Sequence, residues 1–369
     1  MAIIWDVDVD RPVLPPLRGS VSVDLCVVGL GGSGLTAVRE AQARGMSVVG
    51  IDADRIAAGA AGRNGGFLLA GIAAFHHDAI DAHGHDKALA LYQHTVEEMD
   101  RIEAATPEAV TRNGVLRKAH DDAEWEDCLV HRDALAADGF PVTEYRGAQG
   151  QGILIPTDGV FNPARRACAL ARAAIADGAR LYADTPAVEI ASGVVHTPEG
   201  EVRAPRIIVA VDGNLHTAVP SLADRVKPVR LQMVATAPTS VRLEHPVYAR
   251  DGWDYWQQLS NGRIAIGGGR DVAGDSEWTE VAEPTPEIRA YLESLLAEMG
   301  IDAPIEHHWA ATVSYTETGL PVVAEVAPGV WAIGGYCGTG NVVGALLGRG
   351  LVEQFATGTS GAVDDFALR

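Results

Sequence analysis

The amino-acid sequence predicts an α/β fold built on a Rossmann-type nucleotide-binding domain, and two observations carry this prediction. A short apolar stretch, Leu25–Val28, leads into a glycine-rich segment, Gly29–Gly34. A helical pattern and a second apolar stretch that ends at Asp52 follow. The chain of 369 residues also exceeds the size at which a single hydrophobic core keeps growing. We therefore expect one large domain or two interleaved ones.

The glycine-rich segment satisfies the pattern G-x-G-x-x-G. We expect Gly29 to permit a tight turn, Gly31 to let the backbone approach a pyrophosphate, and Gly34 to bring the helix close to the strand. The first amide groups of the helix would offer positive charge to phosphates, and Asp52 would accept hydrogen bonds from ribose hydroxyls. The predicted dinucleotide contacts in this part of the chain are Gly29, Gly31, Gly32, Ser33, Gly34, Asp52 and Ala53.

A second glycine-rich segment, Ala60–Phe67, follows directly after the second apolar stretch. The first glycine pattern alone does not choose between NAD and FAD. A nicotinamide-binding domain would normally continue into a helix at this point, so the loop favours FAD. A surface loop without a role in binding is the alternative for this segment.

Composition and charge exclude several classes of function. The chain is 47% hydrophobic and 21% charged, as in ordinary globular proteins, and its formal net charge of -20 disfavours nucleic acid and anionic membranes as partners. The first ten residues lack the pattern of a secretory signal, and no apolar stretch reaches membrane-spanning length. Four widely separated cysteines favour the reducing cytoplasm. The histidine-rich stretch 76–86 lacks helical spacing and thiols, so no metal site is expected.

Taken together, these segments resemble the D-amino-acid-oxidase-like flavoprotein superfamily, which includes glycine and sarcosine oxidases. The gamma-glutamylputrescine oxidase branch is the most similar, because Trp5 and a proline-rich stretch, Pro12–Pro16, precede the first strand, and Gly62–Gly66 matches a G-R-N-G-G loop. The resemblance runs from about Trp5 to Phe355. Its further matches lie at 159–163, 186–189, 207–213, 261–268, 318–323 and 334–344.

The resemblance implies two interleaved domains. An FAD-binding domain of the Rossmann type would comprise about 1–75, 151–225 and 320–369. A substrate domain with a mainly antiparallel sheet would comprise 76–150 and 226–319. The active site is expected between them, because binding pockets often lie at domain interfaces.

The resemblance also implies further contacts with FAD. In the family, the residue that matches Val188 contacts the adenine through its backbone, and the segment around Ala210 and Gly213 lies against the nucleotide. The backbone amides of Gly340 to Val342 would face the flavin N1–C2=O edge as a positive pole, although a plain turn capped by Asn341 is the alternative. The remaining predicted contacts are Arg63, Asn64, Gly65, Gly66, Gly338 and Thr339.

Non-covalent FAD is expected, because neither attachment position of the relatives carries a suitable residue. No cysteine lies at 313–315, where sarcosine oxidases attach their flavin. No histidine lies within 62–74, where dimethylglycine-type relatives attach theirs.

The function implied is oxidation of a C–N bond in a small amine or amino acid by hydride transfer to flavin N5. The imine would hydrolyse, and oxygen would reoxidise the flavin and form hydrogen peroxide. Three residues are candidates for positioning the substrate: Arg63, Tyr255 and His308. Tyr255 and Trp256 point to opposite sides of a strand, so one of them faces the pocket. Each candidate also has an ordinary structural role as its alternative.

Other functions stay open at this stage. One alternative is a dehydrogenase that uses another electron acceptor. In relatives a lysine near the flavin aids the reaction with oxygen, but this chain has only Lys87, Lys118 and Lys227, and the expected position lies near Arg270 instead. An NAD-dependent dehydrogenase and a non-catalytic flavin-binding module are the alternatives of another class.

Overall fold

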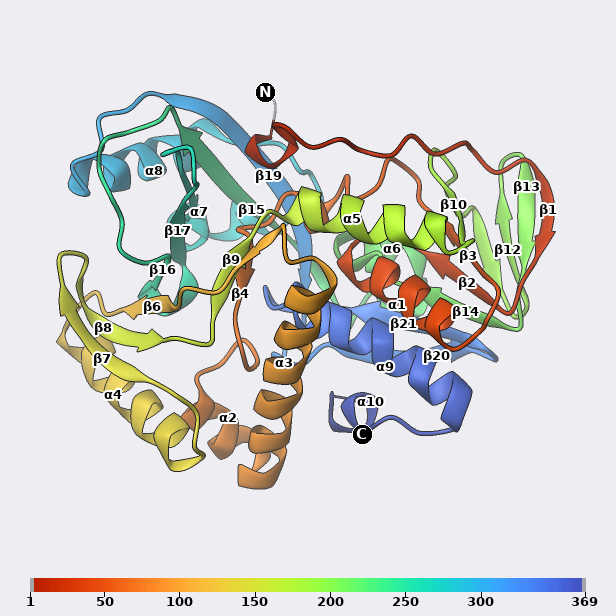
Figure 1. Ribbon diagram of the computed structural model, residues 1–369, viewed down its shortest axis with the longest axis horizontal. Coiled ribbons are helices and arrows are strands. Elements are labelled where there is room, and N and C mark those ends of the chain that lie inside the picture. The colour runs from red at the N-terminus through yellow and green to blue at the C-terminus, as the bar shows by residue number, and fades with distance from the viewer. Residues whose placement is uncertain (1–2, 367–369) are drawn as a thin grey trace.

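The computed structural model describes residues 3–366 and contains two large β-sheets side by side (Figure 1). The first sheet has six strands, and its neighbouring strands are parallel except at the edge pair β21 and β20. In spatial order these strands are β10 (Arg180–Tyr182), β3 (Val48–Ile51), β2 (Leu25–Val28), β14 (Arg206–Val209), β21 (Val330–Gly334) and β20 (Val322–Ala327).

Both faces of the six-stranded sheet are covered, so β2 and β3 are buried at every residue. Leu25 and Val27 pack into a core with three helices on one face: α1 (Gly32–Ala43), α5 (Pro163–Ala176) and α9 (Val343–Thr357). Cys26 and Val28 pack toward a four-stranded sheet on the other face. The strands of that sheet are β1 (Gly19–Ser22), β13 (Gly200–Arg203), β12 (Val194–Thr197) and β11 (Glu189–Ala191).

The second large sheet has eight strands and is antiparallel except where β16 pairs with β6. Its order is β19 (Ile305–Tyr315), β15 (Lys227–Thr236), β18 (Ile264–Gly268), β17 (Asp254–Gln258), β16 (Val247–Ala249), β6 (Val115–Lys118), β8 (Gly150–Ile155) and β7 (Thr143–Gly147). Helix α8 (Pro286–Glu298) packs on it through Ile288, Leu292 and Leu296. Helix α4 (Asp122–Ala137) packs on β8, α2 (His76–His83) packs on α4, and α3 (His85–Ala105) contacts α2 and α9 in the middle of the molecule (Figure 1).

Short elements connect the two sheets. A three-stranded sheet joins β4 (Phe67–Leu68), β9 (Gly159–Phe161) and β5 (Val110–Thr111). The remaining helices are α6 (Leu215–Ala218), α7 (Arg270–Ala273) and α10 (Gly361–Phe366), with 3-10 turns at Ile4–Asp6, Ala60–Gly62, Asp212–Asn214, Pro220–Leu222, Arg250–Gly252 and Gly274–Glu277.

The predicted fold class is confirmed, with one correction at a boundary. The sequence placed residues from 151 onward in the FAD-binding domain, but β8 is hydrogen-bonded between β6 and β7 in the eight-stranded sheet. Residues 151–155 therefore belong to that sheet, because their partners are its strands. The division of the whole chain into two domains stays a prediction.

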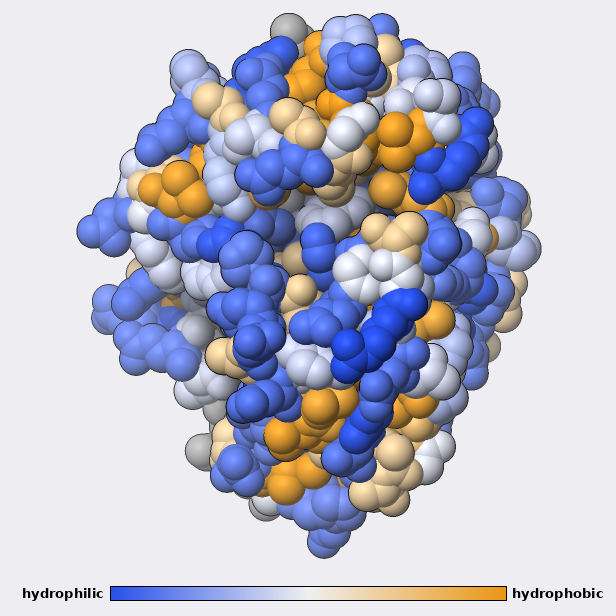
Figure 2. All heavy atoms as spheres, turned by 90° about the vertical axis from the view of Figure 1, so that its left-hand side faces the viewer, coloured by the Kyte–Doolittle hydropathy of each residue, from blue (hydrophilic) through white to orange (hydrophobic). Residues whose placement is uncertain are grey.

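The surface at the end of the eight-stranded sheet is mainly hydrophilic, with small hydrophobic groups between the polar ones (Figure 2). This agrees with a chain of net charge -20. Among residues 3–366, the helices are all too short or too polar to cross a membrane.

Candidate functional site

Two cavities meet between the sheets. A long cleft of about 770 Å³ follows the carboxyl ends of β2, β3 and β14, and a smaller cavity of about 300 Å³ lies against the eight-stranded sheet. Ligands of open parallel sheets bind at this end of the strands. The residues that line both cavities form their junction: Arg63, Asn64, Ala311, Val313, Gly338 and Asn341.

The glycine turn after β2 has the geometry that its sequence predicts. Gly29 adopts a φ of +103°, and a Cβ on Gly34 would lie 1.9 Å from the carbonyl oxygen of Gly29. A Cβ on Gly31 would have a single neighbour within 4 Å among the described residues, the Cβ of Ala61 at 3.0 Å, because it would point into the cleft. Gly29 and Gly34 are thus needed by the fold, whereas Gly31 leaves space for a ligand.

The start of α1 presents free amide groups to the cleft. The first hydrogen bond of the helix runs from the Leu35 N–H to the Gly31 carbonyl, so the N–H groups of residues 32–34 have no partner within the helix. Gly32 and Ser33 line the cleft. This end of the helix is therefore suited to bind phosphate.

Asp52 lies at the end of β3 and lines the cleft beside Ala53. Its Oδ2 accepts a hydrogen bond from the Leu30 N–H at 2.6 Å, and its Oδ1 accepts one from the Asp54 N–H at 3.1 Å. Burial raises the pKa of this carboxyl group above its ordinary value, and these hydrogen bonds oppose the rise. The carboxyl group is thereby held in place, with hydrogen-bonding capacity left over for a hydroxyl group.

The backbone of Val188 also borders the cleft, but its N–H already donates to the carbonyl of His196 at 2.8 Å. A contact of this N–H with a ligand would need that bond to break, so the carbonyl group is the available one. Ala210 and Gly213 line the cleft, and their contact with a nucleotide stays a prediction. The predicted contacts Gly34 and Gly66 line neither cavity, while Gly65, Thr339 and Val342 line the smaller one.

The loop 63–66 is held rigidly at the junction, since side chains bond all four of its carbonyl groups. Trp309 Nε1 donates to the first at 2.7 Å, and Trp5 Nε1 donates to the second at 2.8 Å. Gln257 Nε2 donates to the third and fourth at 2.6 and 3.2 Å. Three distant parts of the chain thus fix one loop.

The unsatisfied hydrogen-bonding groups of Arg63 indicate whether this junction fits a flavin. Its guanidinium group makes one hydrogen bond, from Nη1 to the Ala310 carbonyl at 3.3 Å, and its buried Nε has no partner among the described residues. A buried, unpaired donor is costly unless a ligand satisfies it. An isoalloxazine edge or a carboxylate supplies such an acceptor, so the residues present fit FAD.

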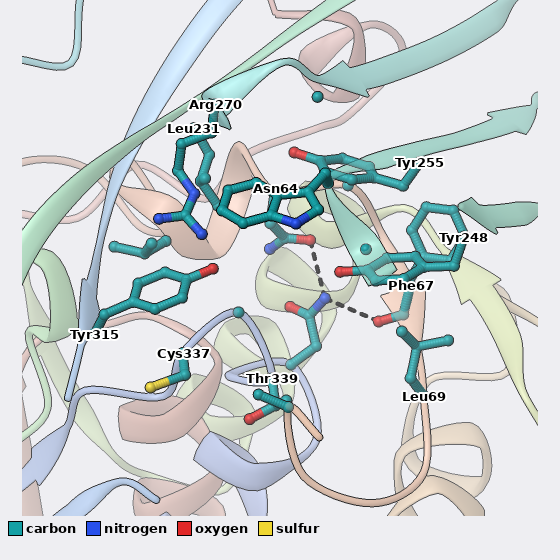
Figure 3. Close-up of a pocket in the computed structure, with 18 of the residues that line it drawn as sticks. Asn64, Phe67, Leu69, Leu231, Tyr248, Tyr255, Arg270, Tyr315, Cys337 and Thr339 are labelled. Atoms are coloured by element: carbon teal, nitrogen blue, oxygen red, sulfur yellow. Dashed lines mark hydrogen bonds between the residues drawn. The ribbon is translucent and has the colours of Figure 1, made fainter. Parts of the chain in front are cut away.

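The C-terminal loop before α9 only partly agrees with the prediction. The Val342 N–H donates to the Thr339 carbonyl at 3.2 Å, so this amide is used within the turn and is not free for a flavin. Gly340 and Asn341 line the cleft, and the side chain of Asn341 donates to Asn64 Oδ1 and to the Phe67 carbonyl (dashed lines in Figure 3). Asn341 therefore ties the two loops of the junction together.

Three tyrosines and an arginine dominate the smaller cavity. The hydroxyl groups of Tyr248 and Tyr315 point toward its centre in Figure 3, and Tyr255 lines it as well. Burial raises the pKa of all three phenols, so they remain neutral hydrogen-bond donors. Arg270 lies over Tyr315, with its guanidinium carbon 4.7 Å from the ring centroid.

The alternation of side chains along a strand determines whether two predicted residues, Tyr255 and His308, face the cavity. Tyr255 faces the cavity and Trp256 faces the core under α8, as the opposite directions of neighbours on β17 require. His308 does not reach the site, which corrects its prediction. It lies on β19 beside Arg289 and Glu293 of α8, whereas Ala311 and Val313 line the cavity. Ala311 and Val313 are two positions apart and so point to the same side of β19, whereas His308 is three and five positions from them and points to the opposite side.

Sequence reasoning missed several residues of the smaller cavity: Arg117, Arg230, Gln232, Tyr248, Glu277, Tyr315 and Cys337. They come from six separate strands, turns or loops, so no local motif unites them. The apolar alternation of 309–315 was the one available signal, and it marks the face of Tyr315.

Comparisons with known proteins agree with this geometry. A "Probable oxidoreductase OrdL" of Rhizobium meliloti is 28% identical over 385 residues, covering 96% of this chain and 88% of that protein. A "Gamma-glutamylputrescine oxidoreductase" of Escherichia coli is 26% identical over 387 residues, covering 95% of this chain and 87% of that protein. The crystal structure of glycine oxidase from Geobacillus kaustophilus has a TM-score of 0.77 at 21% identity, covering 95% and 99% of the two chains, and shows the shared fold.

The pattern of the "FAD dependent oxidoreductase" family matches residues 24–354, which is most of the chain. The match spans the glycine turn after β2, both cavities and the greater part of α9. It favours FAD over NAD for the long cleft. The chain therefore belongs to the family of FAD-dependent oxidoreductases.

Proposed function

We propose that the protein oxidises the C–N bond of a small amine or amino acid with non-covalently bound FAD, forms an imine that hydrolyses, and passes the electrons to oxygen. The junction of the two cavities carries this proposal. The nucleotide cleft opens there into a small aromatic cavity that holds Arg270, an arginine without an ion pair among the described residues. The names of the relatives, a gamma-glutamylputrescine oxidoreductase and a glycine oxidase, support the substrate class. FAD, when bound, supplies a hydride acceptor.

The residues proposed to hold FAD are those predicted contacts that line the cleft. They are Gly29, Gly31, Gly32, Ser33, Asp52, Ala53, Arg63, Asn64, Val188, Ala210, Gly213, Gly338, Gly340 and Asn341. The free amides at the start of α1 suit the pyrophosphate, and Asp52 suits a ribose.

Arg270 is proposed to bind a carboxylate of the substrate. Its guanidinium carbon lies 4.3 Å from the ring centroid of Trp253, 4.7 Å from that of Tyr315 and 5.7 Å from that of Trp278. These rings orient the cation, and among the described residues it forms no ion pair. A fixed guanidinium group is the side chain best suited to hold a carboxylate in one orientation.

The positive charge of the cavity also suits the chemistry of an amine. Oxidation needs the amine in its neutral form, with a free lone pair. Nearby cations such as Arg63 and Arg270 disfavour the ammonium form of a bound amine, because like charges lower the pKa of a base. The buried rings of Tyr248 and Tyr255 help to exclude water.

Anaerobic mixing with a panel of amines and amino acids tests the proposal. We expect at least one of them to bleach the flavin absorbance, and admission of air to restore it with release of peroxide. Arg270→Met should raise KM for substrates that carry a carboxylate and leave KM unchanged for amines without one. A protein whose flavin no amine bleaches would contradict the proposal.

A dehydrogenase with another acceptor is the second candidate, favoured by the absence of lysine from the cavity lining. Lys118 lies 5.6 Å from the ring centroid of Trp256, on the core side of the sheet, and Arg270 follows β18, where the family resemblance implies a lysine. Bleaching by an amine without recovery in air, but with recovery by a redox dye, would establish this candidate instead.

A further inference from the structure

We propose that the substrate of this site carries two anionic groups, most simply two carboxylates, with one bound at Arg270 and the other at Arg117. This inference rests on the proposed function and narrows its substrate class to amines or amino acids with a second acidic group. It follows from the charges that line the smaller cavity and from the partners that those charges lack.

Four arginines line this cavity of about 300 Å³, in a chain of net charge -20. Arg230 is neutralised within the protein, because Glu277 accepts hydrogen bonds from its Nη2 at 2.7 Å and from its Nε at 3.1 Å, and Gln232 also donates to Glu277. Arg63 lies at the junction with the cleft and bonds the Ala310 carbonyl. Arg117 and Arg270 are left for a ligand.

Neither Arg117 nor Arg270 forms an ion pair or a side-chain hydrogen bond within residues 3–366, and the Nε of Arg117 is buried without a partner. Burying a donor of this kind costs free energy that a bound anion would recover. Aromatic rings hold both cations in place: the guanidinium carbon of Arg117 lies 5.0 Å from the ring centroid of Tyr248. The pocket is therefore preorganised for anions.

The two arginines lie at opposite ends of one wall. Arg270 follows β18, while Arg117 lies on β6, and β17 and β16 run between them. Three strand spacings separate their backbones, roughly 14 Å at about 4.8 Å for each spacing. Tyr248 on β16 lies between them and is close enough to both for their charges to lower the pKa of its phenol, against the larger effect of burial. A ligand with two anionic groups can therefore place one at each guanidinium group, on either side of Tyr248.

The nearby carboxylates do not pair with the two arginines. Asp251 lines the cavity but is exposed to solvent. The charge of Asp158 interacts with Arg117, but this carboxyl group is fully buried, does not line the cavity and forms no ion pair with the arginine; burial raises its pKa to about 6. No described acid lies within ion-pair distance of the Arg117 guanidinium.

Equilibrium binding of non-oxidisable probes tests the inference without turnover. Titration calorimetry on the FAD-loaded protein compares glutarate with its monoamide, which has the same length and one charge less, and repeats this with succinate and adipate. We expect a dicarboxylate to bind about tenfold or more tightly than its monoamide, since a charge-assisted bidentate pair is among the strongest hydrogen-bonded contacts.

Variants assign the effect to one residue. Arg117→Met keeps the bulk of the side chain and should abolish the preference for the diacid while monoamide binding changes little; Arg117→Lys should restore part of it. Arg146→Met is the matched control, because Arg146 also lies over an aromatic ring, that of Trp125 at 4.8 Å, but outside the cavity. Its titration should equal that of the parent.

The outcomes separate this inference from the proposed function. Equal binding of diacid and monoamide by the parent, or a full preference retained in Arg117→Met, would overturn the inference even if amines bleach the flavin. A preference that depends on Arg117 in a protein that no amine bleaches would sustain two-anion binding and overturn the proposed function alone. If Arg117→Met fails to fold, the parent comparison and Arg117→Lys still decide.

Discussion

At the scale of single residues, the glycines of one motif have different tasks that the motif itself does not separate. Gly34 packs against the carbonyl group of Gly29, where a Cβ would lie 1.9 Å from oxygen, and Gly31 faces the open cleft. A side chain at Gly34 would therefore strain the fold, whereas a side chain at Gly31 would compete with a ligand.

The first prediction concerns Gly31→Val. We expect the variant to fold, because φ at Gly31 is -87° and the added atoms point into the cleft. FAD affinity should fall by about tenfold or more, about 1.4 kcal/mol of binding free energy, since the side chain occupies space next to the helix amides. Fluorescence titration of the apoprotein with FAD measures this. Gly34→Val is the contrasting variant and should lower the melting temperature even without FAD.

The second prediction concerns Asp158, whose buried Oδ2 has no hydrogen-bond partner among the described residues. Burial raises its pKa from 3.8 to about 6. Because the folded-state pKa lies above the unfolded one, the parent protein should lose stability as pH rises from about 4 to about 6. Asp158→Asn does not titrate, so its stability relative to the parent should rise over this range by as much as about 3 kcal/mol.

Urea unfolding of both proteins at pH 4.5 and pH 7.5 checks this. Other buried carboxyl groups, such as Asp212, titrate in both proteins and cancel in the difference. A difference in stability that does not change with pH would show that Asp158 does not titrate between these values in the folded protein.

At the scale of elements, the loop 63–66 shows how separate strands build one rigid site. Its carbonyl groups are bonded by Trp5 from the N-terminal segment, Gln257 from β17 and Trp309 from β19. The side chain of Asn64 closes the loop by accepting the Gly66 N–H at 2.8 Å. Arg63 is thereby presented to both cavities by a backbone that has little freedom.

The third prediction tests this arrangement with neighbouring glutamines. Gln257→Leu removes the donors to two loop carbonyls and should lower FAD affinity as well as stability, by about 1–3 kcal/mol of unfolding free energy. Gln258→Leu is matched to it, because Gln258 also bonds two carbonyl groups, those of Val241 and Gly262, on the opposite side of β17. It should cost similar stability and leave FAD affinity unchanged. Equal FAD affinities of the two variants would contradict the role of the loop.

At the scale of the whole molecule, the site exists because two sheets built from alternating segments of the chain lie side by side and line two cavities that meet. The parallel sheet contributes the nucleotide cleft, and the antiparallel sheet contributes the aromatic wall and the arginines. This arrangement places a positively charged cavity inside an acidic protein. It also brings Cys337, which the sequence did not associate with the flavin, into the lining of the smaller cavity.

The fourth prediction is that acid precipitation releases intact FAD into the supernatant. Burial raises the pKa of the Cys337 thiol, so the reactive thiolate is disfavoured at neutral pH. The absorbance and fluorescence of supernatant and pellet measure the release. Flavin retained in the pellet of the parent but released from Cys337→Ser would reveal a covalent bond at this cysteine.

The sequence alone determined the nucleotide-binding half of the protein. The glycine turn, the helix that follows and the acid at the end of the second strand are local features, whose backbone requirements are met within about thirty residues, as in any unit of this type. The whole-chain resemblance extended this to the fold class and to the order of the segments. The predicted strand at 25–28 agrees with β2.

Only the tertiary structure decided which side chains form the substrate cavity. Alternation along a strand shows that Tyr255 and Trp256 face opposite sides of the sheet. Which side faces the cavity depends on what packs against the sheet, and here α8 covers the side of Trp256. The same reason removes His308 from the site. Arg117 and Arg270 are about 150 residues apart in sequence and carry no motif, and they share a cavity because long-range strand pairing places β6 two strands from β17.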